Sequence, residues 1–158
     1  MRKTRVLFVC WGDICRSTMA QSVMAHLLRQ AGLSSRVEVD SAGTSDEEEG
    51  RPPHRGTVRQ LEREGIPLVP HRARQLTRAD LESFDWVLVA DGLCLRSLRR
   101  LFPGAHQARI ELLLALDGES RDIADPYYSG DFGATYADVL RGCRALLARL
   151  TEEQKEES

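Results

Sequence analysis

The stretch RVLFVCWGDICRS, residues 5–17, joins a short apolar run to the start of an amphipathic segment. The Val, Leu and Phe residues within 5–10 are typical of a buried strand. Residues 17–31 then carry apolar side chains at i, i+3, i+4, i+7 and i+8, which predicts a helix with one buried face. Gly32 follows at the position of a left-handed helix cap. The stretch therefore predicts a strand, a loop and a helix in succession.

The same alternation continues along the rest of the chain. Further strands are predicted at residues 37–40, 86–90 and 110–116, and helices at 54–64, 77–84, 92–102 and 133–150. Strands that alternate with helices indicate a doubly wound α/β sandwich, with a four-stranded parallel sheet and helices on both faces. We expect residues 1–150 to form a single domain and residues 151–158 to be a polar, acidic tail that frays.

The composition fits one globular domain and argues against several classes of protein. The chain has 158 residues, 42% of them apolar, and a formal charge of −2, so we expect no nucleic-acid or membrane partner. No run approaches the roughly 20 apolar residues of a membrane span. The basic start is followed by too few apolar residues for a secretory signal, which predicts a cytoplasmic protein. The oligomeric state stays open.

The cysteines and histidines match neither a disulfide framework nor a zinc site. Cys10, Cys15, Cys94 and Cys143 form no Cys-x2-Cys pair, and the four histidines lack ligand spacing. Cys94 and Cys143 fall on the apolar faces of predicted helices, so we expect both in the core. No metal ion or other cofactor is predicted.

The loop at residues 10–17 has the chemistry of an anion site. Active sites of parallel α/β sheets lie beyond the carboxyl ends of the strands, where this loop begins. It can wrap so that backbone N–H groups point inward beside the positive end of the following helix. Arg16 can offer two parallel N–H groups to phosphate oxygens. The same field favours the thiolate form of Cys10.

Four motifs in this order resemble the low-molecular-weight protein tyrosine phosphatases, over residues 5 to about 150. The family signature V-C-x-G-N-x-C-R-S-P corresponds to VCWGDICRST at residues 9–18. The D-S-A-G-T, H-x-A-R-Q-L/I and D-P-Y-Y motifs correspond to DSAGT at 40–44, HRARQL at 71–76 and DPYY at 125–128. The resemblance implies a phosphomonoester hydrolase that dephosphorylates phosphotyrosine in proteins and needs no cofactor.

The resemblance also implies catalytic roles for three residues. Cys10 would be the nucleophile and form a phosphocysteine, and Arg16 would hold the phosphoryl oxygens. Asp125 would protonate the leaving oxygen and then activate water. The remaining members of the phosphate-binding loop would be Trp11, Gly12, Asp13, Ile14, Cys15 and Ser17.

The resemblance also implies which residues support the loop and which form the rim of the site. Ser17 would lie near the thiolate, and Ser41 and His71 would brace the loop at position 13. The rim that grips the substrate ring would consist of Trp11, Glu47, Tyr127 and Tyr128. Cys15 matches the second loop cysteine of the family, which can trap oxidised Cys10 as a disulfide.

The chain departs from the family pattern at the loop and at the rim. Asp13 replaces the usual Asn, at a position that needs a left-handed backbone, and Thr18 replaces Pro. Because an ionised Asp13 would oppose both the thiolate and a bound dianion, we predict that it pairs with a charged His71. Glu47 replaces an aromatic residue within the acidic run 46–49, which predicts poor turnover of phosphopeptides with acidic flanks.

Three alternative functions remain open. An arsenate reductase of the same fold needs resolving cysteines beyond the loop, and the expected burial of Cys94 and Cys143 argues against them. A protein-arginine phosphatase carries Thr where this chain has Ile14. A weakly active phosphoprotein-binding module would explain Asp13 and the altered rim, but it would not need Asp125.

Overall fold

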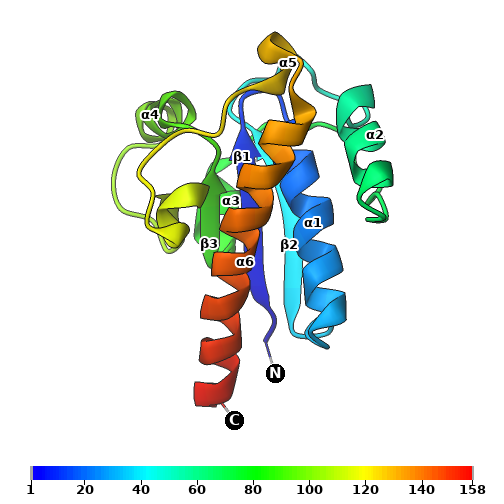
Figure 1. Ribbon diagram of the computed structural model, residues 1–158. Coiled ribbons are helices and arrows are strands. Elements are labelled where there is room, and N and C mark those ends of the chain that lie inside the picture. Colours follow the sequence, from blue (N-terminus) through cyan, green and yellow to red (C-terminus); the bar gives the residue numbers. More distant parts are fainter. Residues whose placement is uncertain (1, 158) are drawn as a thin grey trace.

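The computed structural model describes residues 2–157, which form a parallel sheet between two layers of helices (Figure 1). The strands are β1 (Thr4–Cys10), β2 (Val37–Gly43), β3 (Trp86–Val89) and β4 (Arg109–Leu112). Their order in the sheet is β2-β1-β3-β4. Because β1 pairs with β2 on one side and β3 on the other, the strand order reverses beside it. The loop after β1 therefore lies at the switch point of the sheet, where such folds bind ligands.

The helices cover both faces of the sheet, so the predicted doubly wound fold is confirmed. One layer holds α1, α2, α6 and a short 3-10 helix, η1, and the other holds α3 and α4. Their bounds are α1 (Arg16–Gln30), α2 (Arg55–Arg63), α3 (Arg78–Ser83), α4 (Gly92–Leu101), η1 (Leu113–Asp117) and α6 (Phe132–Glu157). The short α5 (Pro126–Ser129) lies at the end of the molecule where α1 begins (Figure 1). Within residues 2–157, every helix is too short or too polar to cross a membrane.

Strand β1 contributes to the cores on both sides of the sheet. Val6 and Phe8 are buried with side chains of α1 and α6, whereas Leu7 and Val9 are buried with side chains of α3 and α4. Covered on both faces, the strand reads as a continuous apolar run rather than as an alternating one. Cys94 and Cys143 are buried in opposite cores, as predicted.

Three predicted boundaries were wrong. Strand β2 runs on to Gly43 because it pairs with β1 as far as Cys10. The fourth strand ends at Leu112, because the leucines of η1 turn away from the sheet to pack against α6. Helix α6 passes the predicted end at residue 150 and reaches Glu157. Gln154 is buried there, and Arg109 of β4 contacts Glu153 at 3.1 Å, which holds the last turns against the sheet. Fraying of this end in solution stays a prediction.

Candidate active site

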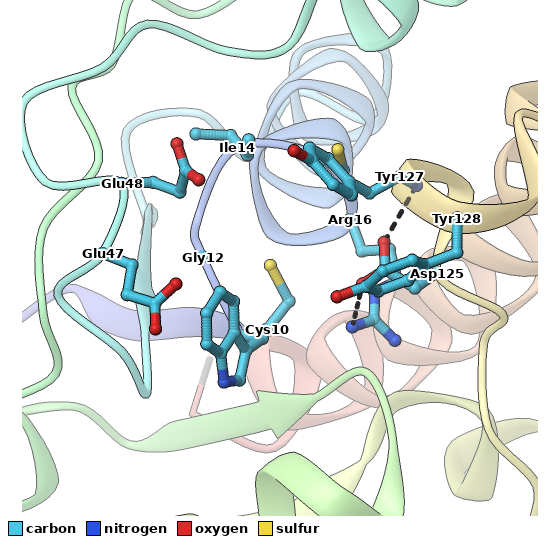
Figure 2. Close-up of a pocket in the computed structure, with 11 residues that line it drawn as sticks. Cys10, Gly12, Ile14, Arg16, Glu47, Glu48, Asp125, Tyr127 and Tyr128 are labelled. Atoms are coloured by element: carbon cyan, nitrogen blue, oxygen red, sulfur yellow. Dashed lines mark hydrogen bonds and ion pairs between the residues drawn. The ribbon is translucent and has the colours of Figure 1, made fainter.

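A cavity of ≈ 170 Å³ opens beside the loop that follows β1 (Figure 2). The three residues predicted to be catalytic all line it, although Asp125 comes from the start of α5. The full lining consists of Cys10, Trp11, Gly12, Ile14, Cys15, Arg16, Glu47, Glu48, Asp125, Tyr127 and Tyr128. Asp13, Ser17, Ser41 and His71 do not line the cavity. The structure thus assembles the predicted loop and rim in one place and adds Glu48, which the prediction had named only as part of the acidic run 46–49.

The loop is held by its carbonyl groups, which leaves its N–H groups unpaired. The carbonyls of Cys10, Trp11 and Ile14 accept hydrogen bonds from the backbone N–H groups of Thr44, Ser45 and His54, at 3.0, 3.0 and 2.7 Å. No backbone N–H of residues 11–15 donates a hydrogen bond within the described part of the chain. A run of unpaired N–H groups beside a helix N-terminus is the arrangement that binds an anion.

The geometry of this loop explains two residues of the motifs, Asp13 and Gly43. Asp13 has φ 59°, the left-handed conformation that was predicted and that Asp tolerates better than most residues. Gly43, in the DSAGT segment, lies so close to the loop that an added Cβ would come within 2.7 Å of the Trp11 carbonyl oxygen. Any side chain at position 43 would therefore push the loop out of place.

Arg16 is anchored through Nη1 of its guanidinium, whereas its Nε has no hydrogen-bond partner. Its Nη1 donates to Asp91 Oδ2 and to the carbonyl of Ile123, both at 2.7 Å. Its Nε is buried without a hydrogen-bond partner, and its Nη2 lies 3.5 Å from Asp125 Oδ2. The Nε–Nη2 edge is the edge that binds two phosphate oxygens at once.

The charges around Arg16 keep it protonated. Burial lowers the pKa of Arg16, but the negative charge of Cys10 and the hydrogen bond to Asp91 raise it above the ordinary value. Burial conversely raises the pKa of Asp91, but hydrogen bonds from the Cys94 backbone and from Arg16 outweigh it and lower that pKa. The prediction missed this role of Asp91. An Asp directly after a parallel strand, capping the next helix, is the signal that could have pointed to it.

Asp125 is placed by the local geometry of the DPYY segment. Its Oδ1 accepts a hydrogen bond from the Tyr127 N–H at 3.0 Å, so it caps α5, and Pro126 occupies the first helical position. Tyr127 and Tyr128 are 57% and 83% exposed, and their rings meet edge to face with centroids 5.4 Å apart. Figure 2 shows both tyrosines beside Asp125 at the margin of the cavity.

A buried network beneath the loop centres on Asp13. Its Oδ2 lies 2.6 Å from His71 Nε2 and accepts from the Arg74 N–H at 3.2 Å, so the predicted contact with His71 is present. Its Oδ1 accepts from the Ser17 hydroxyl at 2.7 Å, and the same hydroxyl lies 3.1 Å from Cys10 Sγ. The prediction that Ser41 braces the loop at position 13 was wrong.

Ser41 takes part in a different contact. Its hydroxyl donates to Gln21 Oε1 of α1 at 2.7 Å, because Ser41 on β2 faces α1 rather than the loop. The backbone of Arg74, which the prediction had not assigned to the site, supplies the contact to Asp13 instead. Motif matching gave no indication of which face Ser41 would occupy.

Cys15 lies in the loop with its side chain buried. Burial, and then the negative charge of Cys10, raise the pKa of the Cys15 thiol far above its ordinary value. Cys15 is therefore a neutral thiol while Cys10 is the better candidate nucleophile. No group of three His, Cys, Asp or Glu side chains among residues 2–157 could hold a metal ion.

Comparisons with known proteins match this arrangement over nearly the whole chain. The family model described as low molecular weight phosphotyrosine protein phosphatase matches residues 5–156. The low molecular weight protein-tyrosine-phosphatase YfkJ of Bacillus subtilis is 38% identical over 152 residues, 95% of this chain and 97% of the relative. The human low molecular weight phosphotyrosine protein phosphatase is 41% identical over 149 residues, 91% of this chain and 94% of the relative.

Solved structures share the fold of this chain over nearly their whole length. The crystal structure of YfkJ matches with a TM-score of 0.92 at 37% identity. The match covers 97% of this chain and 98% of the YfkJ chain. The crystal structure of DARP, a Drosophila arginine phosphatase, has a TM-score of 0.82 at 29% identity, with 92% of this chain and 96% of that chain covered. On this evidence, the chain belongs to the low molecular weight phosphotyrosine protein phosphatase family.

Proposed function

We propose that this protein hydrolyses phosphotyrosine in proteins through a phosphocysteine on Cys10. The observation that carries the proposal is the Nε of Arg16, which has no hydrogen-bond partner, in a cavity that Arg16 lines together with Cys10 and the loop whose N–H groups are unpaired. These groups together supply the donors that a phosphoryl group requires during transfer. The reaction takes place in the cytoplasm, where its cysteines stay reduced.

Two steps follow from the positions of Cys10 and Asp125. In the first, the Cys10 sulfur attacks phosphorus, the S–P bond forms and the P–O bond to the tyrosine breaks, while Asp125 gives its proton to the leaving phenolate oxygen. In the second, Asp125 takes a proton from water as that water attacks phosphorus. The S–P bond then breaks, and inorganic phosphate and the Cys10 thiolate are released. Ser17 Oγ lies 3.1 Å from Cys10 Sγ and donates its one proton to Asp13 Oδ1, so the hydroxyl must turn toward the sulfur to stabilise the departing thiolate.

The depth of the cavity favours a long substrate side chain. Cys10 is only 3% exposed, and the rings of Tyr127 and Tyr128 stand at the margin above it. A phosphorylated aromatic ring can reach the sulfur while its faces contact these tyrosines. The short side chains of phosphoserine and phosphothreonine would have to bring the peptide backbone into the cavity. The relatives named above as phosphotyrosine phosphatases agree with this preference.

Steady-state turnover of p-nitrophenyl phosphate tests the proposal, with Cys10→Ser as the control. The wild type should turn over, and Cys10→Ser should be inactive yet still bind phosphate, because the loop N–H groups remain. Acid quench followed by mass spectrometry should detect a phosphocysteine in the wild type alone. Peptides with phosphotyrosine, phosphoserine or phosphoarginine establish the substrate, and thiol-coupled arsenate reduction tests the reductase alternative. Turnover by Cys10→Ser would exclude the mechanism.

A further inference from the structure

A second hollow, with a volume of ≈ 510 Å³, lies next to the candidate active site. His54 lines it, and the ring of His54 contacts that of Tyr127 edge to face with centroids 6.0 Å apart. Tyr127 lines the cavity that contains Cys10, and the His54 backbone donates to the Ile14 carbonyl of that cavity. His54 and Tyr127 therefore separate the two hollows as a shared wall. A peptide whose phosphotyrosine enters the first can extend across this wall into the second.

Three arginines of α2 line the second hollow. Arg55, Arg59 and Arg63 are spaced four residues apart, so they fall on one side of the helix, and all three are exposed. No carboxylate in the described part of the chain lies within ion-pairing distance of any of them. The acidic residue of the hollow, Asp131, already accepts a hydrogen bond from the Ala134 N–H at 2.9 Å. The hollow therefore presents a positive stripe without a partner, hereafter the α2 arginine stripe.

The opposite side of the active site carries the opposite charge. Figure 2 shows Glu47 and Tyr127 on opposite sides of the Cys10 sulfur. Glu48 is compensated by Arg51, whose Nε lies 3.2 Å from its Oε2, whereas Glu47 is exposed and makes no ion pair among the described residues. The cavity thus has a negative side at Glu47, and the α2 arginine stripe lies in the neighbouring hollow beyond Tyr127 and His54.

The spacing of the stripe matches an extended peptide. Four helical residues rise about 6 Å, and alternate residues of an extended strand are about 6.6 Å apart and point to the same side. Acidic side chains at every second position of an extended peptide can therefore each meet one arginine. The small difference in spacing accumulates slowly enough for the long arginine side chains to absorb it.

We propose that the α2 arginine stripe binds an acidic segment of the substrate, on one side of the phosphotyrosine only. The inference rests on the proposed phosphotyrosine phosphatase activity and names its substrate class as phosphotyrosine peptides with Asp or Glu at alternate positions of one flank. Glu47 disfavours acidic residues on the other flank. The acidic run 46–49 predicted poor turnover of peptides with acidic residues on either flank. The present proposal limits that effect to one flank.

The test compares kcat/KM for three phosphotyrosine peptides at low ionic strength. One carries acidic residues at alternate positions before the phosphotyrosine, one carries them after it, and one carries Gln at all of these positions. One acidic peptide should exceed the Gln peptide by about 3- to 10-fold, as expected for a few exposed ion pairs, and the other should not. The preference should shrink in 0.5 M salt, because the charges are exposed.

A matched pair of variants assigns the preference to the stripe. Arg59→Gln/Arg63→Gln should remove most of it, while Arg99→Gln/Arg100→Gln, an equal change of charge on exposed residues of α4, should keep it. Both variants should turn over p-nitrophenyl phosphate like the wild type. If the wild type does not turn it over, the proposed function fails. If it does but neither acidic peptide is preferred, or both variants lose the preference alike, the stripe proposal is overturned.

Discussion

The charge of Asp13 can be tested through its contact with His71. The Ser17 hydroxyl joins Asp13 Oδ1 to Cys10 Sγ by contacts of 2.7 and 3.1 Å, so the carboxylate lies within about 6 Å of the sulfur. At that distance, and at an effective dielectric constant of about 20, one unit charge opposes another by about 3 kcal/mol. That energy corresponds to about 100-fold in an equilibrium constant, and an anion bound in the same loop is opposed in the same sense. A protonated His71, 2.6 Å from the other carboxylate oxygen, cancels most of it.

The experiment is a double-mutant cycle of Asp13→Asn and His71→Gln. The inhibition constant of inorganic phosphate is measured against p-nitrophenyl phosphate turnover in all four proteins. His71→Gln keeps a hydrogen-bond donor but removes the positive charge, so it should weaken phosphate binding by about 10- to 100-fold. In the Asp13→Asn background the same change should cost less than about 3-fold, because no buried carboxylate is left uncompensated. Asp13→Asn alone should tighten phosphate binding slightly.

Circular dichroism melting of each variant separates loss of folding from loss of binding. If His71→Gln weakens phosphate binding equally in both backgrounds, His71 acts only as a neutral brace and the ion pair is refuted. If His71→Gln has no effect with Asp13 present, Asp13 carries no charge that needs a partner, and the ion pair is refuted as well.

Three further predictions concern the acid, the anchor of Arg16 and the packing of α6. Asp125→Asn should lower kcat by about 10²- to 10⁴-fold for poor leaving groups and by less for good ones, and equal losses in a series of aryl phosphates would remove Asp125 from the role of acid. Asp91→Asn should lower the free energy of unfolding by about 1–3 kcal/mol at pH 7. Folding lowers the pKa of the Asp91 carboxyl, so its ionised form stabilises the folded protein. This stabilisation is fully present above the unfolded pKa of about 3.9 and is lost as the pH falls through the folded pKa. In urea unfolding, the difference in stability between the wild type and Asp91→Asn should thus be smaller at pH 3 than at pH 7. An equal difference at both pH values would contradict this role of Asp91. Gly142→Ala should lower the free energy of unfolding by about 1–3 kcal/mol in the same assay, because the added Cβ would lie 2.4 Å from Leu113 Cγ. An unchanged unfolding midpoint would show that Leu113 in η1 can move aside at little energetic cost.

The sequence alone was sufficient for the order of the elements and for the phosphate-binding loop. Periodicity identifies β1 and α1 because the pattern of apolar residues reports directly which faces are covered. The loop could be recognised because Cys10 and Arg16 lie six positions apart, between a strand and a helix. The capping of α5 by Asp125 and the left-handed turn at Asp13 are likewise local, since neighbouring residues supply the geometry.

The contacts between distant segments were decided by the tertiary structure. Arg16 is oriented by Asp91 and the Ile123 carbonyl, which reach it only because the ends of β3 and the segment before α5 pass beside β1. Ser41 belongs to a matching motif yet faces Gln21, since the pleat of β2 determines where its side chain points. The 3-10 turn after β4 and the extra turns of α6 depend on packing against each other rather than on local propensity. The residues that line the cavity likewise come from segments that only the packed fold brings together. The position of a side chain in space depends on the packing of whole elements and not on its neighbours along the chain.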